Sequence, residues 1–523
     1  MAGIEMVSRK FVVFAMLFAV GLLLFLNSDS DCSSAESDSG DTAYVYSGSC
    51  GDDATFVFNR DSGALTISGS GGITETPWAD YKESVKSIVI GDSITSLIHS
   101  AFSGCSSLVS LKLSAGLTSI DYYAFYRCSA LTELTIPESV TSLGNYAFGG
   151  CSKLSSLTIP ISLDLVTSKY YSAFDGVTSL RSVVFTPGTG IGVDYDYSIT
   201  IDNRYWYTPW YFSKSVLTKV TMQEGITSVG ACSFESCSSL TELTLPDSLT
   251  SIGHGAFYQC SSLTELSIPD SVTSIGSSAF SGCSSLISLK LGAGLTSIDD
   301  GVFSGCSALT ELTIPESVTS LGIYAFRGCS KLSSLTIPIS LNTVYTNDNT
   351  SPTSYYSKFA GVTSLKSVTF SQGTGIGVSL TTDTYLYTPW YLSKSVLSEV
   401  TMQEGITSVG SYMFCGCSSL TELRFPDSLI AISSSAFQDC SSLTELAIPD
   451  SVTDLGNYAF RGCSKLSSLT IPISLNTVQY NNDHYYPRYY PKFSGVTTLQ
   501  SIIFTPGVGT GVDYTTSSYL NTP

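Results

Sequence analysis

The sequence predicts a β-solenoid: a stack of short coils with a parallel sheet along one face and short helical or irregular segments on the other. Three observations predict this fold. Similar units recur every 23 residues, an apolar motif recurs with them, and a longer period marked by Thr-Pro-Trp overlies both.

The 23-residue step is clearest in residues 251–296, where SIGHGAFYQCSSLTELSIPDSVT is followed by SIGSSAFSGCSSLISLKLGAGLT. The apolar motif is one apolar residue followed, after two others, by apolar–x–apolar. It occurs 17 times, from Val85-Ile88-Ile90 to Leu499-Ile502-Phe504. Self-similarity at a fixed period of this length is typical of units that stack on one another.

The first element of a unit is a strand. In LTELSIP the alternation puts Leu266 and Ile268 on one face and Glu265 on the other. Pro269-Asp270-Ser271 then ends the strand and turns the chain.

The remainder of the unit returns to the interior. Val272 and Ile275 point inward, Gly276 permits a backbone bend, and Ala279-Phe280 closes the coil with a small and a large side chain. About seven apolar side chains at roughly 2 kcal/mol each do not offset the ordering of a whole unit at roughly 1.5 kcal/mol per residue. One coil therefore does not fold alone, and neighbouring coils share a sheet and a core.

The longer period divides the array into blocks. TPW begins at Thr76, Thr208 and Thr388, and the first cysteine of each series follows 29 residues later. Each block ends in an irregular unit where valine replaces cysteine, at Val177, Val362 and Val496.

These marks predict the following organisation: 1–35, a signal peptide or N-terminal anchor; 36–75, a β-rich cap; 76–187, block 1; 188–207, a Gly/Tyr-rich connection; 208–372, block 2; 373–387, a connection; 388–506, block 3; and 507–523, the start of a further connection. A fourth TPW would begin at Thr522-Pro523, so we expect the sequence to be a fragment.

The N-terminus predicts export. Arg9 and Lys10 precede an apolar run from Phe11 to Leu26, which is short for a bilayer span and typical of a secretory signal. Small residues at 33–35 offer a cleavage site, and an uncleaved anchor is the alternative. We therefore expect an extracellular or cell-surface protein that meets a membrane only through this segment, if it stays uncleaved.

The composition limits the partners. Charged residues make up only 13% of the chain, and the net charge is −19. An acidic surface disfavours phosphate backbones and anionic lipids, so no nucleic-acid partner is expected.

The cysteines recur with the repeat, and we interpret them as a structural ladder. A residue that recurs once per coil forms a line, whereas zinc needs ligands that converge on a point. Disulfides between neighbouring coils would place the Cβ atoms beyond their usual separation. Buried thiols that act as small apolar spacers are therefore expected at Cys105, Cys128, Cys151, Cys237, Cys260, Cys283, Cys306, Cys329, Cys417, Cys440 and Cys463.

No catalytic, cofactor or metal site is predicted. The three histidines lie in unrelated contexts, and the Gly-rich stretches such as GTGIGVDY (188–195) lack the helix of a nucleotide-binding loop. Asp194 and Asp196 could contribute to a calcium site, but their spacing is not a full loop motif. The glutamates on the outward strand face are read as solubilising.

The repeated wording AFxGCSSLTxLxIPxSVTSIG resembles the BspA-like leucine-rich repeats of microbial surface proteins, over roughly residues 45–515. SGSCGDDATFVFNRDSGALTISGSGGI (47–73) resembles the β-rich segment that commonly precedes such arrays. The resemblance implies a leucine-rich-repeat solenoid and, in several members, adhesion to host proteins or other microbes. It supplies no catalytic residues, and the Tyr-rich insertions depart from the plain repeat.

The insertions are the candidate binding surface. Tyrosine beside Ser, Asn and Asp is the composition of surfaces that bind, although these rings could equally cover irregular joints between blocks. The candidates are Tyr170, Tyr171, Tyr195, Tyr197, Tyr205, Trp206, Tyr207, Tyr355, Tyr356, Tyr485, Tyr486, Tyr489 and Tyr490. The leading hypothesis is a non-enzymatic adhesin for host or microbial surface proteins or glycans, and the alternative is a structural spacer or surface-layer component without a specific ligand.

Overall fold

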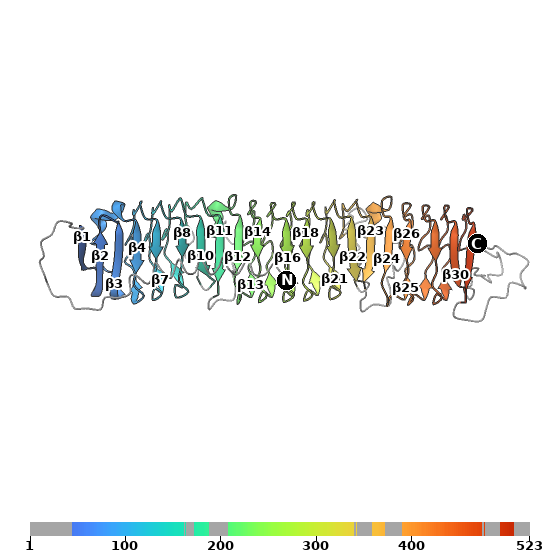
Figure 1. The fold of residues 1–523 in the computed structure, drawn as a ribbon, viewed down its shortest axis with the longest axis horizontal. Helices are drawn as coiled ribbons and strands as arrows, with labels where there is room; N and C mark the ends of the chain where they lie inside the picture. The colour runs from blue at the N-terminus through green and yellow to red at the C-terminus, as the bar shows by residue number, and fades with distance from the viewer. Residues whose placement is uncertain are drawn as a thin grey trace, which may run out of the picture. The chain divides into compact units, whose positions relative to one another are not determined.

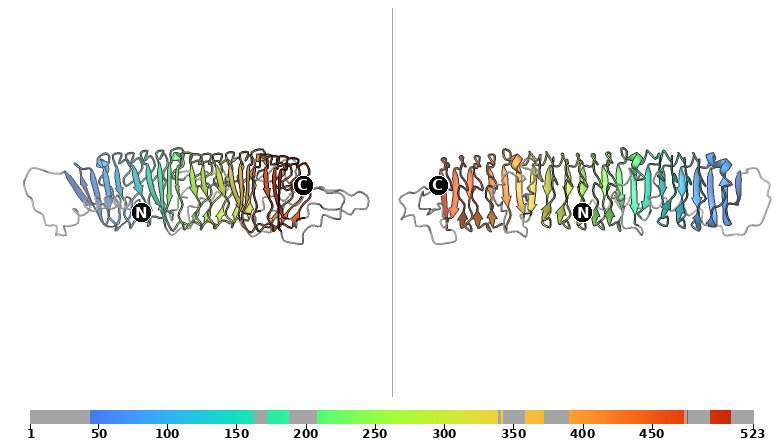
Figure 2. Two further views of the ribbon diagram at one scale, coloured as in Figure 1. Left: turned by 45° about the vertical axis from the view of Figure 1, so that its right-hand side comes forward. Right: turned by 180° about the vertical axis from the view of Figure 1, so that it is seen from behind.

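The computed structural model describes residues 44–161, 163, 172–187, 208–338, 341, 358–371, 390–472, 475 and 492–506. These residues belong almost entirely to one compact unit, Val45–Pro523. Within that unit the coils follow one another as a continuous stack (Figures 1 and 2). The expected solenoid with a parallel sheet is confirmed.

The N-terminal cap is a three-stranded antiparallel sheet made of β1 (Val45–Ser49), β2 (Asp53–Asn59) and β3 (Ala64–Gly72). In β2 the alternation buries Phe56 and Phe58 and exposes Val57. The last strand then pairs in parallel with the first coil, Leu65 beside Ile88. The cap therefore covers the first coil and continues its sheet.

The long strands follow the cap, one per coil, and their number equals the 17 motifs in the sequence. They are β4 (Ser87–Ile90), β6 (Ser110–Lys112), β8 (Glu133–Thr135), β10 (Ser156–Pro160), β11 (Ser182–Thr186), β12 (Lys219–Met222), β14 (Glu242–Thr244), β16 (Glu265–Ser267), β18 (Ser288–Lys290), β20 (Glu311–Thr313), β22 (Ser334–Pro338), β23 (Ser367–Ser371), β24 (Glu399–Met402), β26 (Glu422–Arg424), β28 (Glu445–Ala447), β30 (Ser468–Pro472) and β31 (Ser501–Thr505).

The strand register places residues from equivalent repeat positions side by side. Leu266 pairs with Leu289 and Leu335 with Val368, and these four inward residues are buried. Pairing also continues where two blocks meet, in the order β10-β11-β12-β14 and again β22-β23-β24-β26. The Thr-Pro-Trp coils are therefore ordinary members of the stack.

A second row of short strands runs beside the first. They are β5 (Ile94–Ser96), β7 (Ser119–Ile120), β9 (Ser142–Leu143), β13 (Ser228–Val229), β15 (Ser251–Ile252), β17 (Ser274–Ile275), β19 (Ser297–Ile298), β21 (Ser320–Leu321), β25 (Ser408–Val409), β27 (Ala431–Ile432) and β29 (Asp454–Leu455). Helix is limited in the described residues to the 3-10 turns η1 (Ala79–Ser84), η2 (Tyr211–Ser213) and η4 (Tyr391–Ser393). None of the described helices has the length and apolar character to span a bilayer.

Glycine at position 276 serves close approach rather than the expected bend. Gly276 donates its backbone N–H to the Ile252 carbonyl of the preceding coil at 2.8 Å. A Cβ on Gly276 would lie 2.6 Å from the His254 nitrogen, a distance that real Cβ atoms do not tolerate. The glycine therefore lets two backbones touch.

The core contains three columns of stacked rings, which we call the phenylalanine columns. Successive ring centroids lie 4.9–5.7 Å apart, and all the planes are within 17° of parallel. Each column begins with the tryptophan of a Thr-Pro-Trp coil. The columns are Trp78, Phe102, Phe125, Phe148, Phe174; Trp210, Phe234, Phe257, Phe280, Phe303, Phe326, Phe359; and Trp390, Phe414, Phe437, Phe460, Phe493.

The leading tryptophan also replaces a backbone hydrogen bond. In an ordinary coil the phenylalanine N–H donates to a carbonyl of the next coil, as Phe102 does to Ala124 at 2.8 Å. In the Trp210 coil the indole Nε1 donates to the corresponding carbonyl, that of Ser233, also at 2.8 Å. Trp78 and Trp390 do the same. A single residue thus starts both the ring stack and its hydrogen-bond ladder.

Candidate functional site

The 13 aromatic residues expected to bind ligand all lie outside the described residues. The structure does show where their segments rejoin the stack. The Tyr146 N–H donates to the Ser172 carbonyl at 3.2 Å, Phe326 to Lys358 at 2.9 Å, and Phe460 to Lys492 at 3.0 Å. Each insertion therefore returns directly against the last regular coil of its block.

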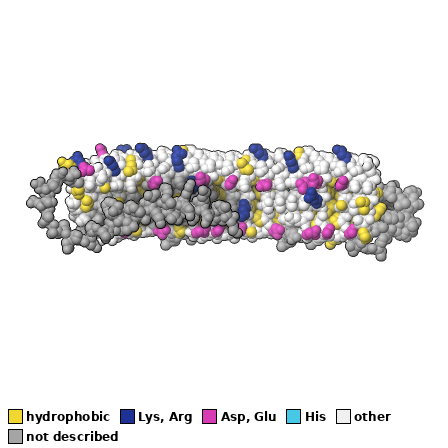
Figure 3. Space-filling model, viewed as in Figure 1, with side chains coloured by type: hydrophobic (Ala, Val, Ile, Leu, Met, Phe, Trp, Pro, Cys, Tyr) yellow, Lys and Arg dark blue, Asp and Glu magenta, His cyan; other side chains and the backbone are white. Residues whose placement is uncertain are grey.

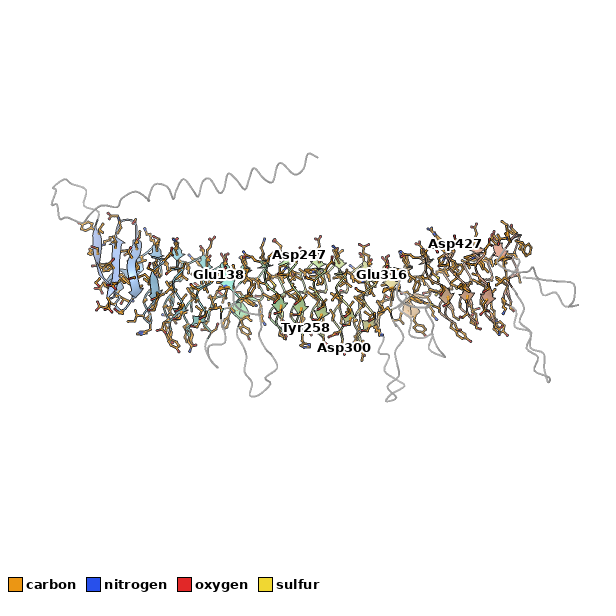
Figure 4. All side chains as sticks on the ribbon, turned by 90° about the horizontal axis from the view of Figure 1, so that it is seen from below. Glu138, Asp247, Tyr258, Asp300, Glu316 and Asp427 are labelled. Carbon is orange, nitrogen blue, oxygen red and sulfur yellow. The ribbon has the colours of Figure 1, made fainter. Side chains whose placement is uncertain are left out.

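The last regular coil of every block carries a tyrosine, within the sequences NYAF (145–148), IYAF (323–326) and NYAF (457–460). We call Tyr146, Tyr324 and Tyr458 the joint tyrosines. Each lies two residues before a column phenylalanine. Figure 4 shows that Tyr258, which directly follows such a phenylalanine, lies on the side of the stack opposite the turns marked by Glu138.

The backbone of the joint tyrosines is strained. Their φ angles are 59°, 61° and 59°, in the left-handed region that favours glycine. Most other coils hold serine, glycine or cysteine at this position, for example Ser278 at 59° and Gly255 at 58°, and two further coils hold Tyr123 and Tyr412 there. Left-handed backbone costs a side-chain-bearing residue on the order of 1 kcal/mol. Tyrosine at these positions therefore needs a reason other than the fold of the coil.

Block 1 enlarges this feature into an aromatic cluster. Tyr123 stacks on Tyr146 with ring centroids 5.1 Å apart and meets Tyr126 edge-on at 5.3 Å. The Arg127 guanidinium lies over the Tyr126 ring at 5.1 Å. Tyr122, which precedes Tyr123 in the sequence, is 52% exposed. The cluster presents ring faces, hydroxyls and a cation together.

Blocks 2 and 3 repeat the combination of ring and cation on a smaller scale. Arg327 lies over Tyr324 at 4.8 Å, and Arg461 lies over Tyr458 at 5.3 Å. In each case the arginine follows the tyrosine by three residues. Aromatic rings with adjacent cations are suited to contact with sugar rings, carboxylates and other aromatic groups.

Reasoning from the sequence alone missed the joint tyrosines because it looked for binding residues only within the insertions. A usable clue was present. Tyrosine occupies this position in the last regular coil of all three blocks, whereas most other coils have Ser, Gly or Cys there.

The outward glutamates of the long strands form a second polar feature. Rows of acidic side chains cross the face seen in Figure 3, with lysines and arginines gathered along one edge. Lys219 and Glu242 approach to 2.7 Å, and Glu399 lies beside Glu422. Because the Lys219 and Glu242 side chains are largely exposed, their ion pair contributes little to stability.

Within the described ranges, no three His, Cys, Asp or Glu side chains lie close enough to hold a metal ion. A shallow hollow of about 280 Å³ is lined by Asp299, Asp300 and serines. Its Asp300 carboxylate already accepts the Ile323 N–H at 2.6 Å, so it has a structural role.

The structure places all 11 ladder cysteines in the core as buried, unbridged thiols. Most donate a hydrogen bond to the phenylalanine carbonyl of the preceding coil, as Cys283 does to Phe257 at 3.6 Å. Burial raises the pKa of the Cys283 thiol from its ordinary value of 9.0 to about 12. Thiols with such pKa values are protonated and unreactive at neutral pH.

The raised pKa predicts loss of stability in alkaline solution. Between pH 9.0 and about 12 an unfolded Cys283 releases its proton while the folded one keeps it. The unfolded state therefore binds fewer protons, and the free energy of unfolding falls as the pH rises. In the variant Cys283→Val, valine replaces cysteine as it does naturally at position 177. The free energy of unfolding of this variant should fall less steeply with pH, by about 1.4 kcal/mol per pH unit. Denaturant unfolding of both proteins from pH 8 to 11 checks this, and equal slopes would contradict it.

Comparison with known proteins gives one family. The family model for the BspA type leucine rich repeat region matches residues 79–193, 209–333 and 390–486, more than half of the chain. No curated protein sequence matches the chain.

Solved structures of bacterial repeat proteins are similar along most of the chain. A leucine-rich repeat protein from Bacteroides ovatus is 20% identical, with 87% of this chain and 98% of that chain covered and a TM-score of 0.36. A leucine rich cell surface protein from Faecalibacterium prausnitzii is 20% identical, with 91% and 100% covered and a TM-score of 0.29. With scores this low, the family assignment rests on the repeat model.

Proposed function

Since the chain belongs to the family with BspA type leucine rich repeats, we propose that it is a cell-surface recognition protein without enzymatic activity. It binds host or microbial surface proteins or glycans where the insertion of each block rejoins the stack, at the joint tyrosines. The joint tyrosines are the described residues that we assign to this surface. The observation that carries this proposal is the presence of a strained tyrosine at every joint.

The chemistry of the joints supports recognition. Tyrosine supplies a large, stiff contact with a polar tip, and its binding contribution does not require a deep pocket. The neighbouring arginines add charge at two of the three joints. Because the joint recurs three times, weak individual sites would act together through their high effective concentration.

Replacing the joint tyrosines tests the proposal. The triple variant Tyr146→Ser, Tyr324→Ser, Tyr458→Ser should keep the fold, because Ser278 occupies the same position at the same φ. Binding to the best target from a screen of glycans and surface proteins should fall at least tenfold, about 1.4 kcal/mol. Surface-based binding assays on the full chain provide the measurement.

Tyr412→Ser is the matched control. Tyr412 has the same position and a φ of 58°, but it lies in a coil that does not receive an insertion. It should leave binding unchanged. Equal losses in the control and the triple variant would contradict a specific role for the joints. Absence of any ligand, together with ordered self-assembly, would favour the spacer or surface-layer alternative.

A further inference from the structure

Two lysines stand at a position that the solenoid core otherwise fills with uncharged side chains. In an ordinary coil the residue before the column phenylalanine is usually alanine, as in Ala459-Phe460, where the alanine is 0% exposed. The coils that close blocks 2 and 3 have Lys358 and Lys492 there. Lys492 is only 2% exposed. A buried cation is costly unless a strong partner compensates it, so Lys492 needs an explanation.

The backbone of the closing coil fixes where the Lys492 side chain begins. The Phe460 N–H donates to the Lys492 carbonyl at 3.0 Å, and the Gly462 N–H donates to the Ser494 carbonyl at 2.8 Å. Phe493 stacks on Phe460 with ring centroids 5.5 Å apart and planes 9° from parallel. Lys492 therefore occupies the alanine position of the ladder, in register with the last regular coil of block 3.

The partner of the Lys492 amine is a side-chain amide. The Lys492 Nζ donates to Asn457 Oδ1 at 3.2 Å. Asn457 is held in place by its own coil, since its backbone carbonyl accepts the Ser435 N–H at 2.8 Å. Because Oδ1 is bonded to Cγ, this hydrogen bond also brings the amine nitrogen next to the amide carbon. The two residues are 35 positions apart in the chain, on either side of the aromatic insertion of block 3.

A neutral lysine amine beside an asparagine amide is a nucleophile beside an electrophilic carbon. Burial lowers the pKa of the Lys492 amine from its ordinary value of 10.5, although the negative charge of Asp454 opposes this shift. The lower pKa increases the fraction of the amine that carries a free electron pair at neutral pH. The fixed approach of the two groups further favours their reaction over that of free side chains in water.

From this arrangement we propose that Lys492 and Asn457 form an intramolecular isopeptide bond. The Lys492 Nζ attacks the Asn457 Cγ, a new C–N bond forms, and the bond between Cγ and Nδ2 breaks. One proton passes from Nζ to Nδ2, which leaves as ammonia. The chain therefore loses one NH3, and the step needs no oxidant, reductant or co-reactant. The Asp454 carboxylate, whose charge acts on Lys492, can carry this proton.

The bond would join the two ends of residues 457–492 and so tie the aromatic insertion of block 3 covalently to the stack. Closing a loop in this way restricts the unfolded chain, as a disulfide does, but reducing agents would not open it. The proposal does not depend on the recognition function of the joint tyrosines.

Blocks 1 and 2 serve as internal comparisons, because each lacks one of the two reacting groups. Block 1 has the asparagine, Asn145, but Ala173 stands in place of the lysine. Block 2 has Lys358, but Ile323 stands in place of the asparagine. Both groups therefore occur together at these positions in block 3 alone.

Tryptic digestion of the denatured full chain, followed by mass spectrometry, tests the proposal. Without the bond, trypsin releases residues 425–461, which contain Asn457, and cleaves after Lys492. With the bond, Lys492 carries no charge and is not a cleavage site. Residues 425–461 should then stay linked to the peptide that begins at Tyr489, with a combined mass lower by one ammonia. We expect the linked form to predominate.

Two variants remove the reacting groups and introduce residues that the chain itself has at equivalent positions. Lys492→Ala reproduces block 1, and Asn457→Ser reproduces Ser277, so both should keep the fold. Each should abolish the linked peptide and the loss of ammonia. Lys358→Ala and Asn145→Ser are the matched controls, and both should leave the linked peptide of block 3 unchanged.

The proposal is overturned if trypsin cleaves after Lys492 and both peptides have their full mass, because the contact is then a hydrogen bond only. It is also overturned if the loss of ammonia persists in Lys492→Ala, because Asn457 has then cyclised onto its own backbone instead of reacting with the lysine.

Discussion

Phe280→Ala is expected to lower the free energy of unfolding by about 3–5 kcal/mol. Phe280 is fully buried at the middle of the second phenylalanine column, with Phe257 at 5.2 Å and Phe303 at 5.7 Å. Its removal leaves a cavity and breaks two ring contacts, each worth about 0.5–1.5 kcal/mol beyond burial. Rigid neighbouring coils limit collapse into the space. Denaturant unfolding followed by circular dichroism measures the change.

Phe212→Ala is the matched control, because Phe212 is 39% exposed and lies outside the columns. It should change the free energy of unfolding by less than about 1 kcal/mol. Similar losses in the two variants would show that the columns do not hold the stack together.

Trp210→Ala should produce a comparable loss, about 3–5 kcal/mol, and should also separate the unfolding of block 1 from that of block 2. Trp210 contacts Phe185 of one block and Phe234 of the next, at 5.5 and 4.9 Å. In a stack whose coils contact only their neighbours, one weakened interface divides the cooperative unit. Calorimetry should therefore resolve two transitions in place of one.

Trp210→Phe separates the ring from the hydrogen bond. Phenylalanine keeps the stack but removes the indole N–H, so the buried Ser233 carbonyl loses its donor. The expected loss is about 1–3 kcal/mol without a second transition. Two unfolding transitions in Trp210→Phe, or a single transition in Trp210→Ala, would contradict the role assigned to the ring.

Much of this architecture could be predicted from the sequence because stacking forces repetition. Coils that stack in register need the same residue type at equivalent positions. Leu266 and Leu289, which pair in the sheet, therefore occupy the same position of the 23-residue repeat. The strand count followed for the same reason. The cap was predictable only through the resemblance of residues 47–73 to the β-rich segment that commonly precedes such arrays.

Other features depend on contacts between coils that no local pattern reveals. The two-residue strands such as Ser274–Ile275 are too short to leave a periodic pattern. The close approach of Gly276 to His254 involves a residue from another coil, so the sequence alone indicates only a bend there. The tryptophan of Thr-Pro-Trp was seen as a block marker, whereas its place at the head of a ring column needed the structure.

The candidate site was harder to predict than the fold. The aromatic insertions draw attention by composition, yet the strain at Tyr146, Tyr324 and Tyr458 is a property of φ, which sequence does not show.

Distances between spin labels test most directly the claim that successive coils lie over one another. Labels introduced as noncanonical amino acids at 221 and 336 stand on β12 and β22, and labels at 135 and 267 stand on β8 and β16. Each pair spans five coil steps, although the second pair is further apart in sequence. Pulsed electron resonance should give about 24 Å for both pairs, five steps of about 4.8 Å. Distances that differ between the pairs in proportion to sequence separation would contradict the stacked solenoid.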